Sequence, residues 1–114
     1  MEATQNQMSN YESVGRAYAC AELAAREAFG LRYSLLPNKS SLFFSPLREF
    51  NAYANHAAKA QIALVRKGRH SKNYEKFAEI LGSLPIGFTR NLQYVSAIER
   101  ATIDQGYYKQ ISGH

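Results

Sequence analysis

The stretch SPLREFNAYANHAAKAQIALVRKGRHSKNYEK, residues 45–76, decides the predicted fold of this chain. Ser45 is a favourable helix N-cap, and Pro46 suits the first helical position, where a backbone N–H has no partner inside the helix. Gly68 is typical of the residue just past a helix C-terminus. Between these signals the sequence predicts a helix of roughly 22 residues, about six turns.

The predicted helix has two different faces when its residues are placed about 100° apart. A broad apolar face is expected to point into a core: Leu47, Phe50, Ala54, Ala57, Ala58, Leu64 and Val65. A narrow separate line is polar and mostly cationic: Arg48, Asn55, Lys59 and Arg66. Basic residues continue past the helix end: Lys67, Arg69, His70, Lys72 and Lys76. This pattern favours a ligand with evenly spaced negative charge, such as a nucleic-acid backbone, although solvated helix faces often look similar.

Composition narrows the class of protein. A length of 114 residues predicts one domain, and 46% apolar with 20% charged residues is typical of a folded chain. The formal charge of +5 favours polyanionic partners. The single cysteine, Cys20, excludes an internal disulfide and is expected to be a small buried residue. No apolar run approaches the about 20 residues of a membrane span, and the polar start lacks a signal-peptide core, so we expect a cytoplasmic protein.

The N-terminal part of the chain predicts another helix. Ser9 and Glu12 form a capping-box pattern with Ser9 as the N-cap, and Gly30 ends the helical spacing. We therefore expect residues 1–9 to be a flexible N-terminal segment. The helix is rich in alanines, which let another helix approach closely: Ala17, Ala19, Ala21, Ala24, Ala25 and Ala28.

The segment Leu31–Phe44 is the least regular part of the chain. Its centre, PNKSS at residues 37–41, is typical of a turn. The apolar residues on either side either fold back onto the core or form a partner-binding loop. Beyond the stretch quoted first, Ser71 or Asn73 is expected to cap a third helix that runs through Ser83.

A fourth helix is expected after the break LPIGF at residues 84–88. Thr89 or Asn91 would cap it, and its apolar side would carry Leu92, Val95, Ile98 and Thr102. No run alternates with a period of two over the length of a strand. The sequence therefore predicts an all-α fold, a compact helical bundle of about four to five helices at residues 10–111, with a loose tail at 112–114.

The search for chemistry finds no catalytic pattern. There is no CxxC, no HExxH, no carboxylate cluster and no Gly-rich phosphate loop, so we expect neither an enzyme nor a cofactor. His56, His70 and His114 are too far apart in sequence to predict a metal site. Tyr53 and Tyr74 lie near the basic stretch, where they could stack on bases or, as is more usual, cover the edge of a core.

Two short segments resemble a known family. YESVGRAYACAE at residues 11–22 and GYYKQ at residues 106–110 are similar to the last domain of the type I-C CRISPR large subunit. Between them, the Pro46-Leu47 helix start and the Arg66-Lys67 helix end are also similar to that family. The chain departs from the family at Lys109, where the family has His. The family's domain is also made separately, as the small subunit of the Cascade surveillance complex, and the length and polar start of this chain agree with such a free subunit.

The resemblance implies a non-catalytic subunit that contacts the displaced non-target DNA strand and stabilises the guide RNA–target DNA hybrid. Its partners would be this nucleic-acid complex, the Cascade backbone and large subunits, and further copies of itself. Sequence reading would belong to the guide RNA, so the protein would need only backbone contacts. The alternative is a helical protein–protein adaptor without nucleic-acid contact, which would bind through Leu31–Phe44 or through the alanine-rich first helix.

The residues expected to contact nucleic acid are Arg48, Asn55, Lys59, Arg66, Lys67, Arg69 and Lys72. Arg90 and Lys76 are weaker candidates. The glycines and aromatic residues of the two family-like segments, Gly15 and residues 106–108, are expected to serve helix packing rather than binding.

Overall fold

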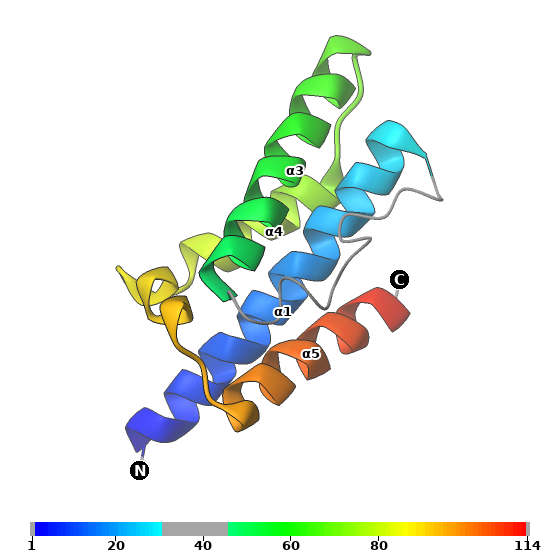
Figure 1. The fold of residues 1–114 in the computed structure, drawn as a ribbon. Helices are drawn as coiled ribbons and strands as arrows, with labels where there is room; N and C mark the ends of the chain where they lie inside the picture. Colours follow the sequence, from blue (N-terminus) through cyan, green and yellow to red (C-terminus); the bar gives the residue numbers. More distant parts are fainter. Residues whose placement is uncertain (1, 31–45, 114) are drawn as a thin grey trace.

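The described part of the chain is built from α-helices and one 3-10 helix (Figure 1). The computed structural model describes residues 2–30 and 46–113, without the side chains of residues 2–7 and of Asn91. Its elements are α1 (Glu2–Phe29), α3 (Pro46–Arg66), α4 (Lys72–Gly82), η1 (Phe88–Gln93) and α5 (Ala97–Ser112). No strand occurs within these residues, so the predicted all-α helical bundle is confirmed. The predicted loop Leu31–Phe44 and the predicted N-cap Ser45 lie outside them.

Helix α1 is the centre of the bundle and packs against α3, α4 and α5. Helices α3 and α5 run parallel to α1, and α4 runs back along it (Figure 1). The alanines predicted to allow close helix approach are all buried: Ala17, Ala19, Ala21, Ala24, Ala25 and Ala28. Small side chains on several sides of one helix let three other helices pack around it. The bundle is thus organised around α1, although the stretch at residues 45–76 carried the clearest sequence signals.

Helices α1 and α5 meet backbone to backbone at two glycines. A Cβ atom on Gly15 would overlap the Ile103 carbonyl oxygen and would lie 2.7 Å from the Tyr107 amide nitrogen. A Cβ atom on Gly106 would overlap the Glu12 carbonyl oxygen and would lie 2.9 Å from the carbonyl carbon of Glu12. Only glycine fits at either position without moving a backbone. The predicted packing role of both glycines is therefore confirmed.

Polar contacts extend the α1–α5 interface beyond the glycines, toward the C-terminal ends of both helices. The Tyr107 hydroxyl donates to Glu22 Oε2 at 2.6 Å, and Arg26 pairs with the same oxygen at 3.0 Å. Arg16 Nε donates to Gln110 Oε1 at 3.2 Å. Glu22 is buried, so this network ties a buried carboxylate of α1 to the last turns of α5.

Two of the predicted helix starts are wrong. Helix α1 begins at Glu2 rather than after Ser9, because residues 2–8 contain neither glycine nor proline and nothing interrupts the helix before Ser9. Ser96, rather than Thr89 or Asn91, caps the last helix: its hydroxyl accepts from Glu99 N at 3.1 Å, and its own N–H donates to Glu99 Oε1 at 2.8 Å. Residues 88–93 form η1 instead.

Other predicted boundaries agree with the structure. Ser71 caps α4, and its hydroxyl accepts from Tyr74 N at 3.0 Å. Helix α3 ends just before Gly68, whose φ of 70° is the left-handed conformation expected there. Helix α5 continues to Ser112, the first residue of the tail that was expected to be loose. Of its predicted apolar side, Leu92 is buried and Val95 packs against the core, but both lie before α5. Ile98 was wrongly included, since it is 67% exposed, and Ile103 faces the core.

The buried side of α3 differs from the predicted one. Of the residues expected to face the core, Ala57 and Leu64 are buried, whereas Ala58 and Val65 are exposed. The full buried set is Pro46, Glu49, Tyr53, Ala57, Ala60 and Leu64. The helix is therefore turned toward Glu49 and Tyr53, two residue types that a polarity pattern places outside. Leu47, Phe50 and Ala54 are partly buried against the core.

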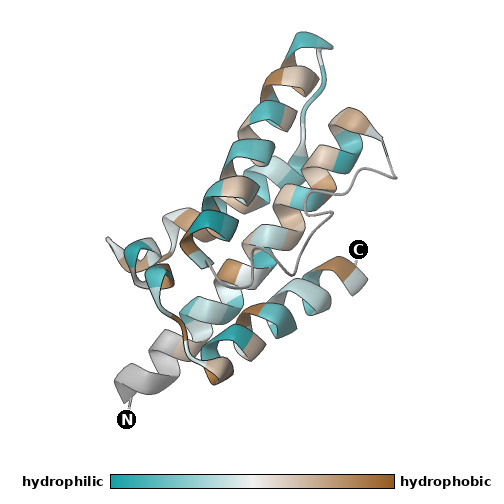
Figure 2. Ribbon diagram, viewed as in Figure 1, coloured by the Kyte–Doolittle hydropathy of each residue, from teal (hydrophilic) through white to brown (hydrophobic). Residues whose placement is uncertain are grey.

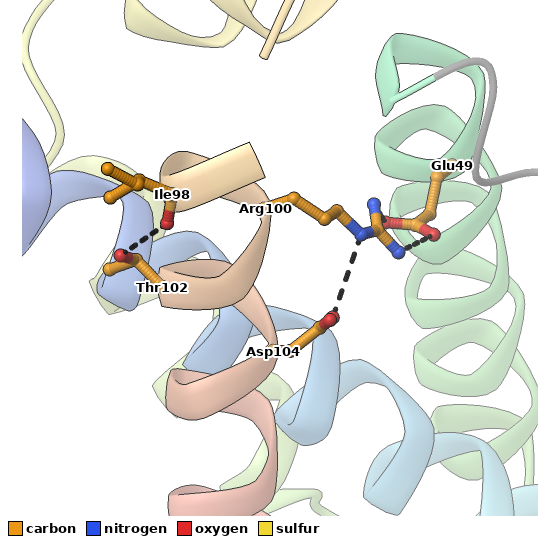
Figure 3. A network of polar contacts seen from close by, with 5 residues as sticks. All are labelled: Glu49, Ile98, Arg100, Thr102 and Asp104. Atoms are coloured by element: carbon orange, nitrogen blue, oxygen red, sulfur yellow. Dashed lines mark hydrogen bonds and ion pairs between the residues drawn. The ribbon is translucent and has the colours of Figure 1, made fainter. Parts of the chain in front are cut away.

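Specific partners explain why these two polar residues of α3 are buried. The guanidinium of Arg100 on α5 donates to both carboxylate oxygens of Glu49, each at 2.8 Å (Figure 3). Burial alone lowers the pKa of Arg100, but the hydrogen bonds and the charge of Glu49 outweigh it, so the pKa is raised. The ring of Tyr53 stacks on Tyr18 of α1 with centroids 4.2 Å apart. Both contacts join sequence-distant residues, so local spacing does not reveal them.

Candidate nucleic-acid interface

The polar line predicted on α3 lies on the solvent side of the helix. Its members are all exposed: Arg48, Asn55, Lys59 and Arg66, called the cation line below. At about 100° per residue these positions fall within one narrow strip on the side opposite to the buried residues. The prediction of an exposed cationic row is therefore confirmed, even though the core side of the same helix was misplaced.

The cation line is long and straight. With a rise of about 1.5 Å per residue, Arg48 and Lys59 are about 16 Å apart along the axis, and Lys59 and Arg66 about 10 Å. The row therefore spans about 27 Å of one rigid helix. A row of this kind can touch several phosphates along a strand, but it cannot surround a single small anion.

The charge of the cation line is not offset from within its own helix. Glu49 is the one acidic residue of α3; it is buried on the core side of the helix and is bound to Arg100. Among the described residues, the ion pairs found involve none of the three cations in the line. The positive charge therefore faces solvent, where it can attract an anionic ligand.

The basic residues after α3 form a turn that extends the cationic surface. Lys67, Arg69 and Lys72 are all exposed, and Figure 2 shows the end of α3 and the turn after it as hydrophilic. We call residues 67–72 the basic turn. It is attached to α1 through Glu27, whose Oε1 accepts from Ser71 Oγ at 2.9 Å and from Asn73 Nδ2 at 2.8 Å.

The cationic character weakens along α4. Glu75 and Glu79 are exposed on this helix beside Lys72 and Lys76. His70 Nε2 lies 2.7 Å from Glu75 Oε1, so this carboxylate sits next to the basic turn. The acids reduce the local positive potential, which agrees with the lower weight given to Lys76.

Of the two tyrosines near the basic stretch, Tyr53 is too deeply buried to stack on a base, and Tyr74 is only partly exposed. Tyr53 is 3% exposed and stacked on Tyr18. Tyr53 therefore packs in the core, as expected, but its ring lies inside the core rather than at its edge. Tyr74 is half-buried and packs obliquely on Phe77 with centroids 6.1 Å apart.

The structure also shows an exposed aromatic residue that the sequence reasoning did not select. Tyr94, between η1 and α5, is 82% exposed. Arg90, one of the two weaker candidates, is exposed on η1 as well. Nothing in the spacing around Tyr94 indicates its exposure, because the residue lies in a connection without helical periodicity.

Residues with metal or nucleophile chemistry do not gather anywhere in the described ranges. No group of three or more His, Cys, Asp and Glu side chains there could hold a metal ion. Cys20 is buried as predicted, and burial raises the pKa of its thiol. Partial burial and then the charge of Lys59 lower the pKa of His56, so this histidine adds no charge to the cation line at neutral pH.

None of the helices at residues 2–30 and 46–113 combines the length and the apolar content that crossing a bilayer requires. No family model, curated protein or solved structure matches this chain.

Proposed function

We propose that the protein binds nucleic acid through the sugar–phosphate backbone, as a non-catalytic small subunit of a CRISPR RNA-guided surveillance complex. It would contact the displaced non-target DNA strand and stabilise the guide RNA–target DNA hybrid. The observation that carries the nucleic-acid part of the proposal is the cation line: Arg48, Lys59 and Arg66 lie in one exposed row.

The geometry favours backbone contacts over base reading. A phosphate needs only a nearby cation, and each neutralised phosphate releases counterions that were condensed on the nucleic acid. The cation line and the basic turn supply such point contacts on a rigid surface. Asn55, which lies within the row, can donate from its amide to a phosphate oxygen.

The assignment to a CRISPR complex rests on the family resemblance. Its two segments, residues 11–22 and 106–110, pack on each other in the structure, where Gly15 and Gly106 meet the facing backbone. Residues distant in sequence but joined in one helix crossing are a more coherent signature than two unrelated short matches. This contact supports the resemblance without depending on the cation line.

The adaptor alternative has lost one of its two proposed surfaces. The alanine-rich face of the first helix is buried inside the bundle and cannot dock a partner. The other surface, Leu31–Phe44, lies outside the described residues. The nucleic-acid proposal, in contrast, uses side chains that are exposed.

The salt dependence of binding to single-stranded DNA tests the interface. Between about 50 and 200 mM salt, the logarithm of the binding constant should fall by about 0.7 per neutralised phosphate for each unit of log salt. Replacing Arg48, Lys59 and Arg66 together by alanine should flatten this slope by about two units. The three residues are exposed, so the melting temperature should change little.

A charge-matched pair of variants separates the cation line from net charge. Lys59→Ala removes one charge from the row, whereas Lys109→Ala removes one exposed charge from α5, outside every candidate contact. Only the first variant should flatten the slope, by about 0.7 units. Equal slopes for both variants, or an unchanged slope in the triple variant, would refute the assignment of α3 as the interface.

The subunit assignment has its own test. The reading frame should overlap the end of a large-subunit gene in a CRISPR operon, and the protein should co-purify with the assembled complex. If the chain binds DNA but never joins such a complex, the proposed nucleic-acid interface would stand and the assignment as a CRISPR subunit would be refuted. Weak binding of the isolated chain is compatible with both, because several copies along one filament multiply weak contacts.

A further inference from the structure

A small pocket lies between the start of α3 and the connection from η1 to α5. Its volume is about 280 Å³, and its lining consists of Pro46, Gln93, Tyr94, Val95, Ser96, Ala97 and Arg100. This volume is near the lower limit of ligand-binding pockets, which suits one flat ring system better than a larger ligand.

The pocket is not built for a phosphate. The guanidinium of Arg100 already donates to both oxygens of Glu49, and its Nε lies 3.7 Å from Asp104 Oδ1 (Figure 3). Two carboxylates thus compensate the one cation of the lining. At the start of α5 the Ser96 hydroxyl accepts from the Glu99 amide, and the Glu99 carboxylate, which accepts from the Ser96 amide, adds a further negative charge beside the pocket. A neutral group is therefore the better occupant.

The chemistry of the lining fits a nucleobase. Tyr94 is 82% exposed although it lines the pocket, so its ring stands at the opening, where a base can stack on it. Gln93 carries an amide that can donate and accept, and Ser96 has a hydroxyl that can do the same. Pro46, Val95 and Ala97 supply apolar surface in the same lining.

The pocket lies at one end of the cation line. Pro46 and Arg48 belong to the same first turn of α3 but lie on different sides of the helix, so a strand that follows the row to Arg48 has to bend around this helix end to reach the pocket. Arg90 provides a cation on its other side: in a 3-10 helix, side chains three residues apart eclipse, which places exposed Arg90 on the same side of η1 as Gln93.

We infer that this pocket takes one unpaired base of a single-stranded nucleic acid whose backbone lies along the cation line, with Tyr94 as the stacking residue. The inference rests on the proposed function and adds a preference for single strands, because a paired base in a duplex cannot enter. Stacking on tyrosine tolerates every base, so it adds affinity without sequence selection.

Two probes of equal charge test the inference on the full chain: an oligothymidylate of about 20 nucleotides, and an abasic phosphodiester chain of the same length. Tyr94→Ala should weaken binding of the oligothymidylate about tenfold and leave binding of the abasic chain unchanged. Tyr94→Phe keeps the ring and should restore the affinity. Tyr108→Ala, at a 58% exposed tyrosine outside the pocket, is the matched control and should bind like the wild type.

The outcomes distinguish this inference from the proposed function. Equal weakening of both probes, or no effect of Tyr94→Ala on either, overturns the base pocket and leaves the cation line in place. Failure of the wild-type protein to bind either probe overturns both proposals. Equal affinity of the wild type for the two probes also overturns the base pocket.

Discussion

Helix α1 contacts its two parallel neighbours in opposite ways. Against α5 it presents bare backbone, because Gly15 and Gly106 each face a carbonyl group of the other helix. Against α3 it uses large side chains, above all the stacked rings of Tyr18 and Tyr53. The first interface is fixed by the absence of side chains and tolerates no added atom. The second depends on the fit between partners and should lose stability in smaller steps.

The largest expected effect is at the glycine crossing. Gly15→Val should destabilise the protein by more than the about 1–3 kcal/mol of ordinary overpacking, since the new atoms collide with backbone rather than with movable side chains. Thermal unfolding followed by circular dichroism would measure this. Gly82→Ala is the control, because an added Cβ there meets nothing within 4 Å. Similar melting temperatures for both variants would contradict the crossing.

A somewhat smaller loss is expected where α3 meets α5. Glu49→Ala leaves the Arg100 guanidinium without its main partner in a mostly buried site, and breaking such pairs costs about 3–5 kcal/mol when both partners are fully buried. Arg100 retains 17% of its side-chain exposure, so we expect about 2–3 kcal/mol. Replacing both residues by methionine should recover much of the loss in urea unfolding. No recovery would mean that Glu49 acts through other contacts.

The stacked tyrosines make the α1–α3 interface sensitive to alkaline pH. Burial is the largest cause that raises the pKa of Tyr18 and of Tyr53 above their ordinary value. In the unfolded chain these phenols ionise near pH 10, whereas in the folded protein they stay protonated. Stability should therefore be complete below about pH 10 and fall as the pH rises above it.

Tyr18→Phe sharpens this prediction. The Tyr18 hydroxyl is buried, and no hydrogen-bond partner is found for it within the described part of the chain. Removing it should leave stability at pH 7 unchanged or raise it by up to about 1 kcal/mol. The alkaline decline should become shallower, as measured by urea unfolding between about pH 8 and 11. An unchanged pH profile would show that other groups control it.

The smallest effect on stability is expected on the outer side of α3. Lys59→Ala should change the free energy of unfolding by less than about 0.5 kcal/mol, because an exposed lysine packs on little. The same change should flatten the salt slope of DNA binding by about 0.7 units. A variant that loses several kcal/mol would show that Lys59 belongs to the fold rather than to an interface.

Helix boundaries were predictable where a local signal stands alone. Ser71 caps α4 and Gly68 follows the end of α3. Both boundaries depend only on residues a few positions away in the sequence, so the sequence alone predicts them. Ser96 was missed because Thr89 and Asn91 offered competing caps earlier in the chain, and choosing among them depends on how residues 88–93 pack. The early start of α1 was missed because a capping-box pattern does not prevent a helix from running through it.

The two sides of α3 also differed in how well the sequence predicted them. The cation line follows from spacing and charge alone, since exposed side chains need no partner. The core side was misplaced because Glu49 and Tyr53 owe their burial to Arg100 and Tyr18, which are distant in sequence. Exposed Tyr94 was missed because its surroundings depend on how η1 packs on α3 and how the connection from η1 reaches α5.

Because α1, α3 and α5 are parallel, their helix dipoles point in the same direction. Aligned peptide dipoles place partial negative charge at the C-terminal ends of these helices, and each ends with a basic residue in its last turn: Arg26, Arg66 and Lys109. The charge of Arg66 therefore already interacts with the negative end of its own helix dipole. Lys59, in the middle of α3, keeps its full charge for an external anion.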